Sequence, residues 1–203
     1  NDIESAGGQA ILYKGDMTSP ADVEGLIAKT IEAFGSSIDI LVNVAGGLVA
    51  RKTIEEMDLE FFNYVMQLNM SSTFLVTKAV VPYMSEGASI INFASQAGRD
   101  GGGPGASAYA TSKGAVMTFT RSMAKELGPK GIRVNSLCCG MISTTFHDTF
   151  SKPEGRAATA GNTPLRREGA PNEVADTVSF LASSDAAFVS GINMDVNGGL
   201  VFS

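Results

Sequence analysis

The sequence is poor in the residues that build metal sites and disulfides. It holds two cysteines, Cys138 and Cys139, which are adjacent, and a single histidine, His147. Neighbouring cysteines seldom suit a structural disulfide or a metal site, so we expect reduced thiols in a buried strand. One histidine leaves very little from which to build a metal centre or a Ser-His-Asp triad. We expect no metal, and we expect His147 to lie in a loop.

The sequence also lacks an excess of basic residues and any long apolar run. Its formal net charge is -6 and its pI is about 4.8, which argues against nucleic acid and anionic membrane surfaces as partners. No apolar stretch approaches the roughly 18 residues of a membrane span, and the polar residues at the start do not resemble a secretory signal. The default expectation is a cytoplasmic protein.

The sequence of 203 residues contains two kinds of apolar segment, which alternate along the chain. Short continuous runs bounded by glycine alternate with longer segments of helical spacing, which is typical of a doubly wound parallel α/β sheet in a single domain. We predict five strands, at 9–14, 38–45, 88–94, 131–138 and 191–196. The four main helices are predicted at 20–34, 58–84, 107–127 and 171–183, and 143–170 is predicted to be a loop-rich insertion.

Proline and serine positions refine the predicted helices. Pro20 and Pro171 suit the first turns of their helices, whereas Pro82 should kink or end the 58–84 helix. Ser107 is a good N-cap for the next helix, which should stop at Gly128.

Three predicted strands end in small or polar residues, at 43–47, 95–98 and 139–140. Ligands of open α/β sheets bind outside the carboxyl ends of the strands, so the site should assemble there. Tyr109 and Lys113 enter that edge on one face of the 107–127 helix, because they are four residues apart. A neighbouring ammonium favours the phenolate, so Tyr109 could exchange a proton with an alcohol or a carbonyl. Alone, this spacing is a weak signal.

The surrounding motifs make the signal specific. They are, in order, NVAG at 43–46, LNMSSTF at 68–74, INFASQAG at 91–98, YATSK at 109–113 and RVNSLCCGMIST at 133–144. Together with the tail from 164 to 199, they resemble the classical short-chain dehydrogenase/reductase family. The resemblance implies a Rossmann-type fold and reversible hydride transfer between NAD or NADP and a small alcohol or carbonyl substrate.

The resemblance also implies roles for individual residues. Tyr109 would be the catalytic acid/base, Lys113 would lower its pKa and hold the nicotinamide ribose, Ser95 would hydrogen-bond the substrate oxygen, and Asn69 would hold a water in the proton relay. The implied cofactor contacts, besides Tyr109 and Lys113, are Asp16 at the adenine, Asn43, Ala45 and Gly46 beside its ribose, and Gly140 and Thr144 near the nicotinamide.

Several of these residues have a simpler interpretation. Ser95 lies 14 residues before Tyr109, one more than the commonest family spacing, and Ser107 is a competing hydroxyl. The role of Asn69 could be limited to hydrogen bonds with the backbone of its own helix, while Asn43 and Asp16 could be turn formers at strand ends.

Other positions depart from the family or bear on its substrate. Cys139 stands where the family usually has proline, and we interpret it as a small apolar replacement. Four arginines, Arg51, Arg99, Arg156 and Arg166, could border the substrate or could be solvated, whereas we interpret Arg167 as structural.

The glycine-rich turn that opens the family fold does not occur before Asp16. We therefore expect the first two strands and the helix between them to be missing from this sequence, and residues 1–6 to be the tail of the second helix. The missing strands would lie between the 9–14 and 38–45 strands. The choice between NAD and NADP stays open for the same reason.

The sequence also leads to expectations about the oligomeric state and leaves two alternative functions open. The helices at 58–84 and 107–127 resemble the pair through which family members form dimers and tetramers, so we expect a homotetramer or a homodimer. One alternative is a non-catalytic oligomeric domain, if the N-terminal half is truly absent. Another is an epimerase or dehydratase of the extended branch, which normally carries a longer C-terminal domain. Specificity is expected in the 143–170 loop.

Overall fold

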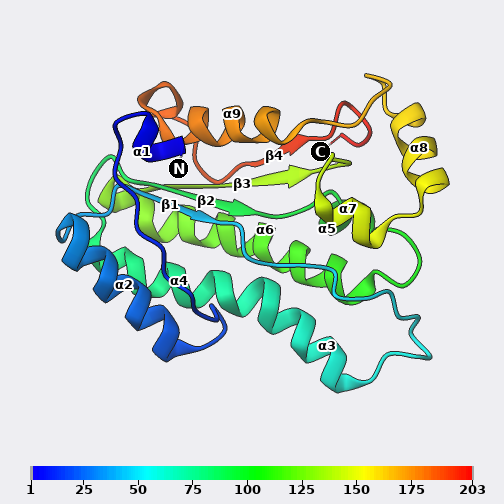
Figure 1. Cartoon of the computed structure of the whole chain (residues 1–203), viewed down its shortest axis with the longest axis horizontal. Coiled ribbons are helices and arrows are strands. Elements are labelled where there is room, and N and C mark those ends of the chain that lie inside the picture. The colour runs from blue at the N-terminus through cyan, green and yellow to red at the C-terminus, as the bar shows by residue number, and fades with distance from the viewer. Residues whose placement is uncertain (1, 203) are drawn as a thin grey trace.

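The structure, a computed structural model, describes residues 2–202 and is built on a four-stranded parallel sheet. The strands follow the chain order across the sheet: β1 (Ile40–Asn43), β2 (Ser89–Phe93), β3 (Arg133–Cys139) and β4 (Asn193–Val196). The register places Asn43 of β1 opposite Asn92 of β2. Helices cover both faces (Figure 1), so the predicted doubly wound α/β fold is confirmed.

The helices divide unevenly between the faces. One face carries α2 (Pro20–Phe34), α3 (Leu59–Met66), α4 (Ser72–Val80) and α6 (Ser107–Leu127), whereas α9 (Pro171–Ala182) covers the other (Figure 1). Shorter helices are α1 (Asp2–Ser5), α5 (Ala97–Asp100), α7 (Thr145–Phe150) and α8 (Pro153–Asn162). The turns of 3-10 helix are Val81–Tyr83, Gly128–Lys130 and Ser184–Ala186.

The two central strands hold the core because their side chains alternate between the faces. Ile90 and Val134 pack with Leu127 on the α6 side of the sheet. Ile91 and Leu137 pack with a different cluster, which includes Leu181 of α9. All residues of β2 except its last are buried, and so are all residues of β3 except its last. The last residues, Phe93 and Cys139, are partly buried and line the cavity described below.

Helix boundaries follow the local sequence signals closely. Ser19 caps α2 by accepting a hydrogen bond from the backbone of Asp22, and Pro20 is the first helical residue. Pro171 opens α9 in the same way. The predicted cap at Ser107 is wrong by one residue, because Ala106 occupies the cap position and Ser107 is the first residue of α6.

The predicted 58–84 helix contains a π-helical segment at Gln67–Ser71, between α3 and α4. It ends as Pro82 requires, since α4 stops at Val80 and Pro82 lies in a 3-10 turn. A π-helical turn inside an α-helix is uncommon and often marks a functional position. Asn69 lies within this turn.

Two predictions of the architecture are wrong. Residues 9–14 form no strand, because within residues 2–202 no strand lies beside them to complete a ladder, and the carbonyl of Leu12 accepts from Lys29 Nζ at 2.9 Å instead. The 143–170 segment is not mainly loop, because it contains α7 and α8. His147 accordingly lies in a helix, whereas a loop was expected. Residues 2–5 are helical as expected, while Asn1 lies outside the described residues.

Among residues 2–202, none of the helices combines the length and the apolar character that crossing a bilayer requires.

Candidate active site

A cavity of about 790 Å³ opens at the carboxyl ends of β1, β2 and β3. Residues from all three strand ends line it, together with the first turns of α6, with α9 and with α7, which lies at the same end of the sheet as the strand ends (Figure 1). Its volume is in the range of small-molecule and cofactor sites. The catalytic candidates Ser95, Tyr109 and Lys113 all line it.

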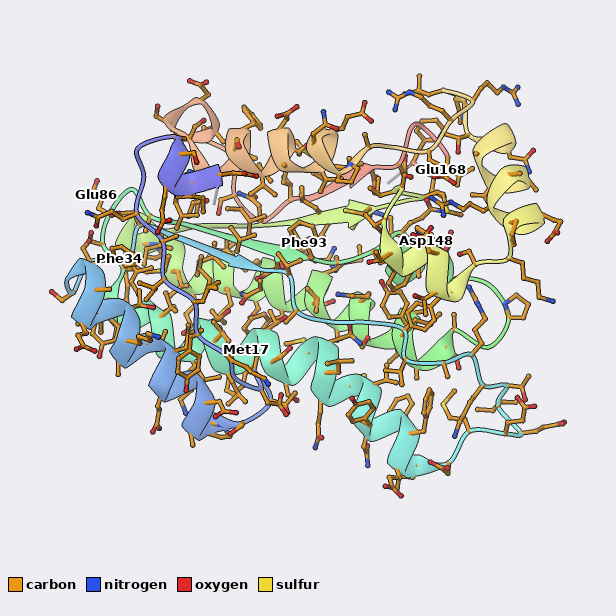
Figure 2. All side chains as sticks on the ribbon, viewed as in Figure 1. Met17, Phe34, Glu86, Phe93, Asp148 and Glu168 are labelled. Carbon is orange, nitrogen blue, oxygen red and sulfur yellow. The ribbon has the colours of Figure 1, made fainter. Side chains whose placement is uncertain are left out.

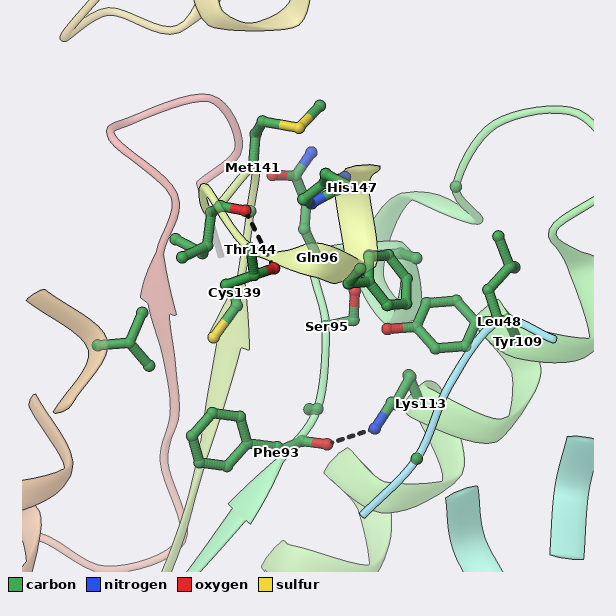
Figure 3. A pocket seen from close by; sticks show the side chains of 18 of the residues that line it. Leu48, Phe93, Ser95, Gln96, Tyr109, Lys113, Cys139, Met141, Thr144 and His147 are labelled. Atoms are coloured by element: carbon green, nitrogen blue, oxygen red, sulfur yellow. Dashed lines mark hydrogen bonds between the residues drawn. The ribbon is translucent and has the colours of Figure 1, made fainter. Parts of the chain in front are cut away.

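Tyr109 lies in the first turn of α6, with its ring at the cavity wall. Burial raises the pKa of its hydroxyl, and a hydrogen bond with Ser95 opposes that rise. Figure 3 shows the two oxygens directed toward one another. The pair therefore presents hydroxyl groups from two different elements, β2 and α6, to one point of the cavity.

Lys113 lies one turn further along α6 and is only 5% exposed. Its ammonium donates to the backbone carbonyl of Phe93 at 2.7 Å and lies 5.8 Å from the centre of the Tyr109 ring. Burial lowers its pKa to about 8. An ammonium held in this way is close to the tyrosine ring, but its hydrogen bond goes to the end of β2 and not to the phenol oxygen.

Ser95 occupies the turn after β2, and the competing Ser107 does not share the cavity. The Ser95 hydroxyl accepts from the backbone N–H of Ala97 at 3.1 Å, whereas Ser107 is exposed at the start of α6. A glycine-rich loop follows α5 and lies between Ser95 and Tyr109. Gly101 has φ 84° and Gly105 has φ 75°, in the left-handed region that side chains disfavour.

Asn69 is fully buried in the π-helical turn and holds the strand-end loop of β1. Its side chain accepts from the N–H of Gly47 at 3.0 Å and donates to the carbonyls of Gly47 and Val65, both at 2.9 Å. A Cβ at Gly46 would lie 2.5 Å from the Asn69 side-chain oxygen and 3.2 Å from Lys113 Nζ. Asn69 therefore packs against Gly46, which lines the cavity together with Lys113.

The candidate cofactor residues fall into two groups. Gly46, Tyr109, Lys113, Gly140 and Thr144 line the cavity, whereas Asp16, Asn43 and Ala45 do not. Gly140 admits no side chain, since a Cβ there would lie 2.7 Å from that of Asn197.

Asn43 and Asp16 have their side chains bonded within the protein. Asn43 donates to Asn92 at 2.9 Å and to Thr77 at 3.2 Å inside the core. Asp16 accepts from the backbone and the hydroxyl of Thr18, both at 2.8 Å, and these bonds lower its pKa.

The residues that fit a nicotinamide lie at the strand ends. There Gly46 and Gly140 line the cavity at positions where close packing against the protein leaves no room for a side chain, and the buried Lys113 supplies a donor. A flat, polar ring with a ribose is the kind of group that such an edge accommodates. Among the described residues, no three histidine, cysteine or carboxylate side chains gather in a geometry that could hold a metal ion.

The two cysteines are free and lie in β3, as predicted. Cys138 is buried in the core, while Cys139 reaches the cavity. Burial raises the pKa of the Cys139 thiol to about 11, with a further rise from Cys138. At neutral pH it is therefore a protonated, small and mostly apolar side chain, which fits our interpretation of this departure from the family.

The four arginines that could border the substrate or be solvated all have hydrogen-bond partners within the protein. Arg99 pairs with Asp195 at 2.7 Å and also binds the carbonyl of Asn193. Arg166 binds the carbonyl of Gly161, and Arg51, which lines the cavity, donates to the carbonyl of Pro104 at 3.0 Å. Arg167 pairs with Glu173 at the start of α9, the structural role expected of it.

Arg156 holds together the segment that covers the cavity. Its guanidinium binds Asp148 in α7, Glu168 after α8 and the hydroxyl of Ser143 before α7. Asp148 and Glu168 lie at the same end of the molecule (Figure 2). We call residues 143–168 the lid, since α7 contributes Phe146 and His147 to the cavity wall.

Sequence reasoning missed Phe146 and His147 as cavity residues. Phe146 lies 6.0 Å from Tyr109, measured between ring centres. The available signal was weak: a short stretch, TFHDTF, with an aromatic residue at every fourth position, which is one helical turn. His147 contacts Ser151 through Nδ1 at 2.9 Å.

Comparisons with known proteins agree with this geometry. A family model described as enoyl-(acyl carrier protein) reductase matches residues 1–201. The chain is 38% identical to a 3-oxoacyl-[acyl-carrier-protein] reductase of Synechocystis, over 98% of this chain and 79% of that protein. It is 40% identical to a 2-(R)-hydroxypropyl-CoM dehydrogenase of Xanthobacter autotrophicus, over 94% of this chain and 77% of the relative.

A solved structure extends the likeness to the fold and to cofactor use. A blue fluorescent protein from a metagenomic library, determined in complex with NADPH, has a TM-score of 0.91 and 29% identity, covering 99% of this chain and 80% of that one. The strand-end cavity, the motifs and these matches agree. The chain belongs to the short-chain dehydrogenase/reductase family and is an NAD(P)-dependent oxidoreductase that transfers a hydride between the cofactor and an alcohol or carbonyl substrate.

Proposed function

We propose that Tyr109 is the acid/base of this reaction and that Ser95 binds the substrate oxygen. The observation that carries the proposal is that both hydroxyls line the cavity and are directed toward one another (Figure 3). In the oxidative direction, the alcohol proton passes to Tyr109 as the carbonyl forms, and in reduction Tyr109 returns a proton to that oxygen. The nicotinamide, when bound, accepts or supplies the hydride on the substrate carbon.

Lys113 and Asn69 are proposed to support this pair. Lys113 would hold the nicotinamide ribose and favour the phenolate of Tyr109 by its charge, which is supported by its burial one helical turn away. Asn69 would hold a water that connects the site to solvent. Its position in the π-helical turn, beside Gly46 and Lys113, supports this role.

The cofactor is proposed to lie along the strand ends. Gly140 and Thr144 would border the nicotinamide, and Gly46, Ala45 and Asn43 would border the adenine ribose. Asp16 would contact the adenine. Support is strongest for Gly46, Gly140 and Thr144, which line the cavity. Because the Asn43 side chain is bonded within the core, its contribution would come from its backbone.

Substrate selection is proposed to reside in the 143–170 segment, whose helices α7 and α8 contribute Phe146, His147 and Thr159 to the cavity.

We further propose a cytoplasmic homotetramer that pairs α3, α4 and α6 between subunits. Exposed Leu59, Tyr64 and Phe74 on the first two helices support this assembly. Light scattering coupled to gel filtration tests the assembly.

Substitution of Tyr109 by phenylalanine tests the central proposal. Tyr109→Phe keeps the ring and removes the hydroxyl, so turnover of any alcohol identified in a substrate screen should fall by a factor of at least about 100. NADH and NADPH binding, followed by cofactor fluorescence, should remain within a few-fold of wild type. Retained turnover in this variant would remove Tyr109 from its proposed role.

A further inference from the structure

Aromatic rings gather around the proposed acid/base residue. The ring of Phe146 lies 6.0 Å from that of Tyr109, with an angle of 37° between their planes. On its other sides Phe146 meets His147 and Phe150, each at 5.1 Å between ring centres. Tyr109, Phe146 and His147 line the cavity, whereas Phe150 is not among its lining residues.

The helix that carries Phe146 does not belong to the core. None of the residues of α7 is buried, and Phe146 and Phe150 are both partly exposed. The helix is held in place by its backbone and polar groups: the N–H of Ser143 donates to Gly169 at 2.9 Å, and Arg156 binds Asp148. The Phe146 ring therefore lies at the cavity wall and outside the buried core.

Around Tyr109, the other boundaries of the cavity leave room for a flat apolar group. Leu48, only 3% exposed, lies beside the Tyr109 ring (Figure 3). Gly102 and Gly103 line the same cavity without side chains. A substrate whose oxygen meets Ser95 and Tyr109 would therefore have a neighbouring substituent close to Phe146.

The charged groups of this wall already have partners in the protein. Asp100 accepts from the side-chain amide of Gln96 at 3.0 Å and from the backbone of Gly102 at 2.8 Å. Arg51 donates to the carbonyl of Pro104. Among the described residues near the hydroxyl pair, the wall is therefore aromatic at Phe146 and polar at Gln96, whose side-chain oxygen has no hydrogen-bond partner.

We propose that Phe146 determines specificity by selecting alcohols and ketones that carry an aromatic ring next to the reacting carbon. The inference rests on the proposed function, because it places the substrate oxygen at Ser95 and Tyr109. Aromatic pairs in tilted or offset contact gain more than their buried area alone provides, which corresponds to roughly 3- to 10-fold in affinity.

A binding experiment tests this without turnover. Fluorine NMR titrations of the whole chain would use 1-(4-fluorophenyl)ethanol and its saturated counterpart, 1-(4-fluorocyclohexyl)ethanol. The wild-type chain should bind the aryl alcohol roughly 3- to 10-fold more tightly. Phe146→Leu, which keeps an apolar side chain, should bring the two affinities within about 2-fold. Phe150→Leu is the matched control, since it alters the same helix outside the cavity and should keep the preference.

The outcomes separate this inference from the proposed function. Equal affinities in the wild type, or no saturable binding of either alcohol, would overturn it, as would a preference that survives in Phe146→Leu. Circular dichroism confirms that both variants fold. The titrations measure binding and not turnover. The aromatic preference can therefore be absent although Tyr109→Phe abolishes turnover, and it can be present although Tyr109→Phe remains active.

Discussion

The two walls of the cavity are built in different ways. The wall that carries Lys113 and Ser95 grows out of β2, β3 and α6, whose side chains interlock in buried clusters. The lid has no buried residue in α7 or α8, and it is held by Arg156 and by short backbone contacts. The proposed catalytic residues are therefore held by packing, which is hard to perturb, whereas the segment proposed to select the substrate is held by polar contacts, which open at low cost.

This comparison predicts that truncating a large side chain matters far more in the core than in the lid. Leu137→Ala, at a fully buried site, should lower the free energy of unfolding by about 2–5 kcal/mol, because it removes apolar contacts and leaves a cavity. Phe150→Ala should lower it by less than about 1 kcal/mol. Urea unfolding followed by circular dichroism measures both, and equal losses would refute the division between core and lid.

Asn43 offers a second test, because its side chain belongs to the core although it stands next to the cavity. Asn43→Ala removes the donor to Asn92 and Thr77, so it should cost about 1–3 kcal/mol of stability from the unpaired buried groups. Cofactor affinity, measured by fluorescence titration, should change little. A large loss of affinity in a protein of unchanged stability would instead assign the amide to the cofactor.

The lid itself should loosen when its central guanidinium is removed. Arg156→Gln breaks the contacts to Asp148, which is exposed, and to Glu168, which is partly buried. We expect faster backbone hydrogen exchange confined to α7 and α8, by several-fold, with β2 and β3 unchanged. Arg166→Gln is the control, because its contact is to a single carbonyl. Unchanged exchange in the lid would show that Arg156 does not hold it.

The difference between the walls also explains what the sequence could predict. Strands β2 to β4 and helices α2, α6 and α9 were predicted within two residues at each end. Their apolar residues recur with the period of the buried face, and prolines mark where two of the helices begin. The grouping of Ser95, Tyr109 and Lys113 followed from the topology of strand ends. Helix α8 was missed because Pro153, Gly155 and Gly161 resemble a loop. Helix α7 was missed because it is only six residues long and has no buried face that would give an apolar period. The 9–14 strand was overpredicted, since an apolar run forms a strand only beside another strand.

His147 gives the smallest expected effect, a pH dependence of lid closure. Burial, followed by the charge of Arg156, lowers its pKa below the ordinary 6.5, while Glu168, Asp148 and a hydrogen bond with the Gly140 backbone oppose that shift. The closed lid thus favours the neutral imidazole, and an open lid takes up a proton at higher pH. Closure is fully favoured above about pH 6.5 and weakens as the pH falls through that value toward the lowered pKa. Hydrogen exchange in α7, divided by that of an unaffected segment to cancel the intrinsic rate, should therefore rise modestly from pH 7.5 to pH 5.5. The rise should disappear in His147→Gln, and a ratio that falls or stays constant in the wild type would show that His147 does not couple pH to the lid.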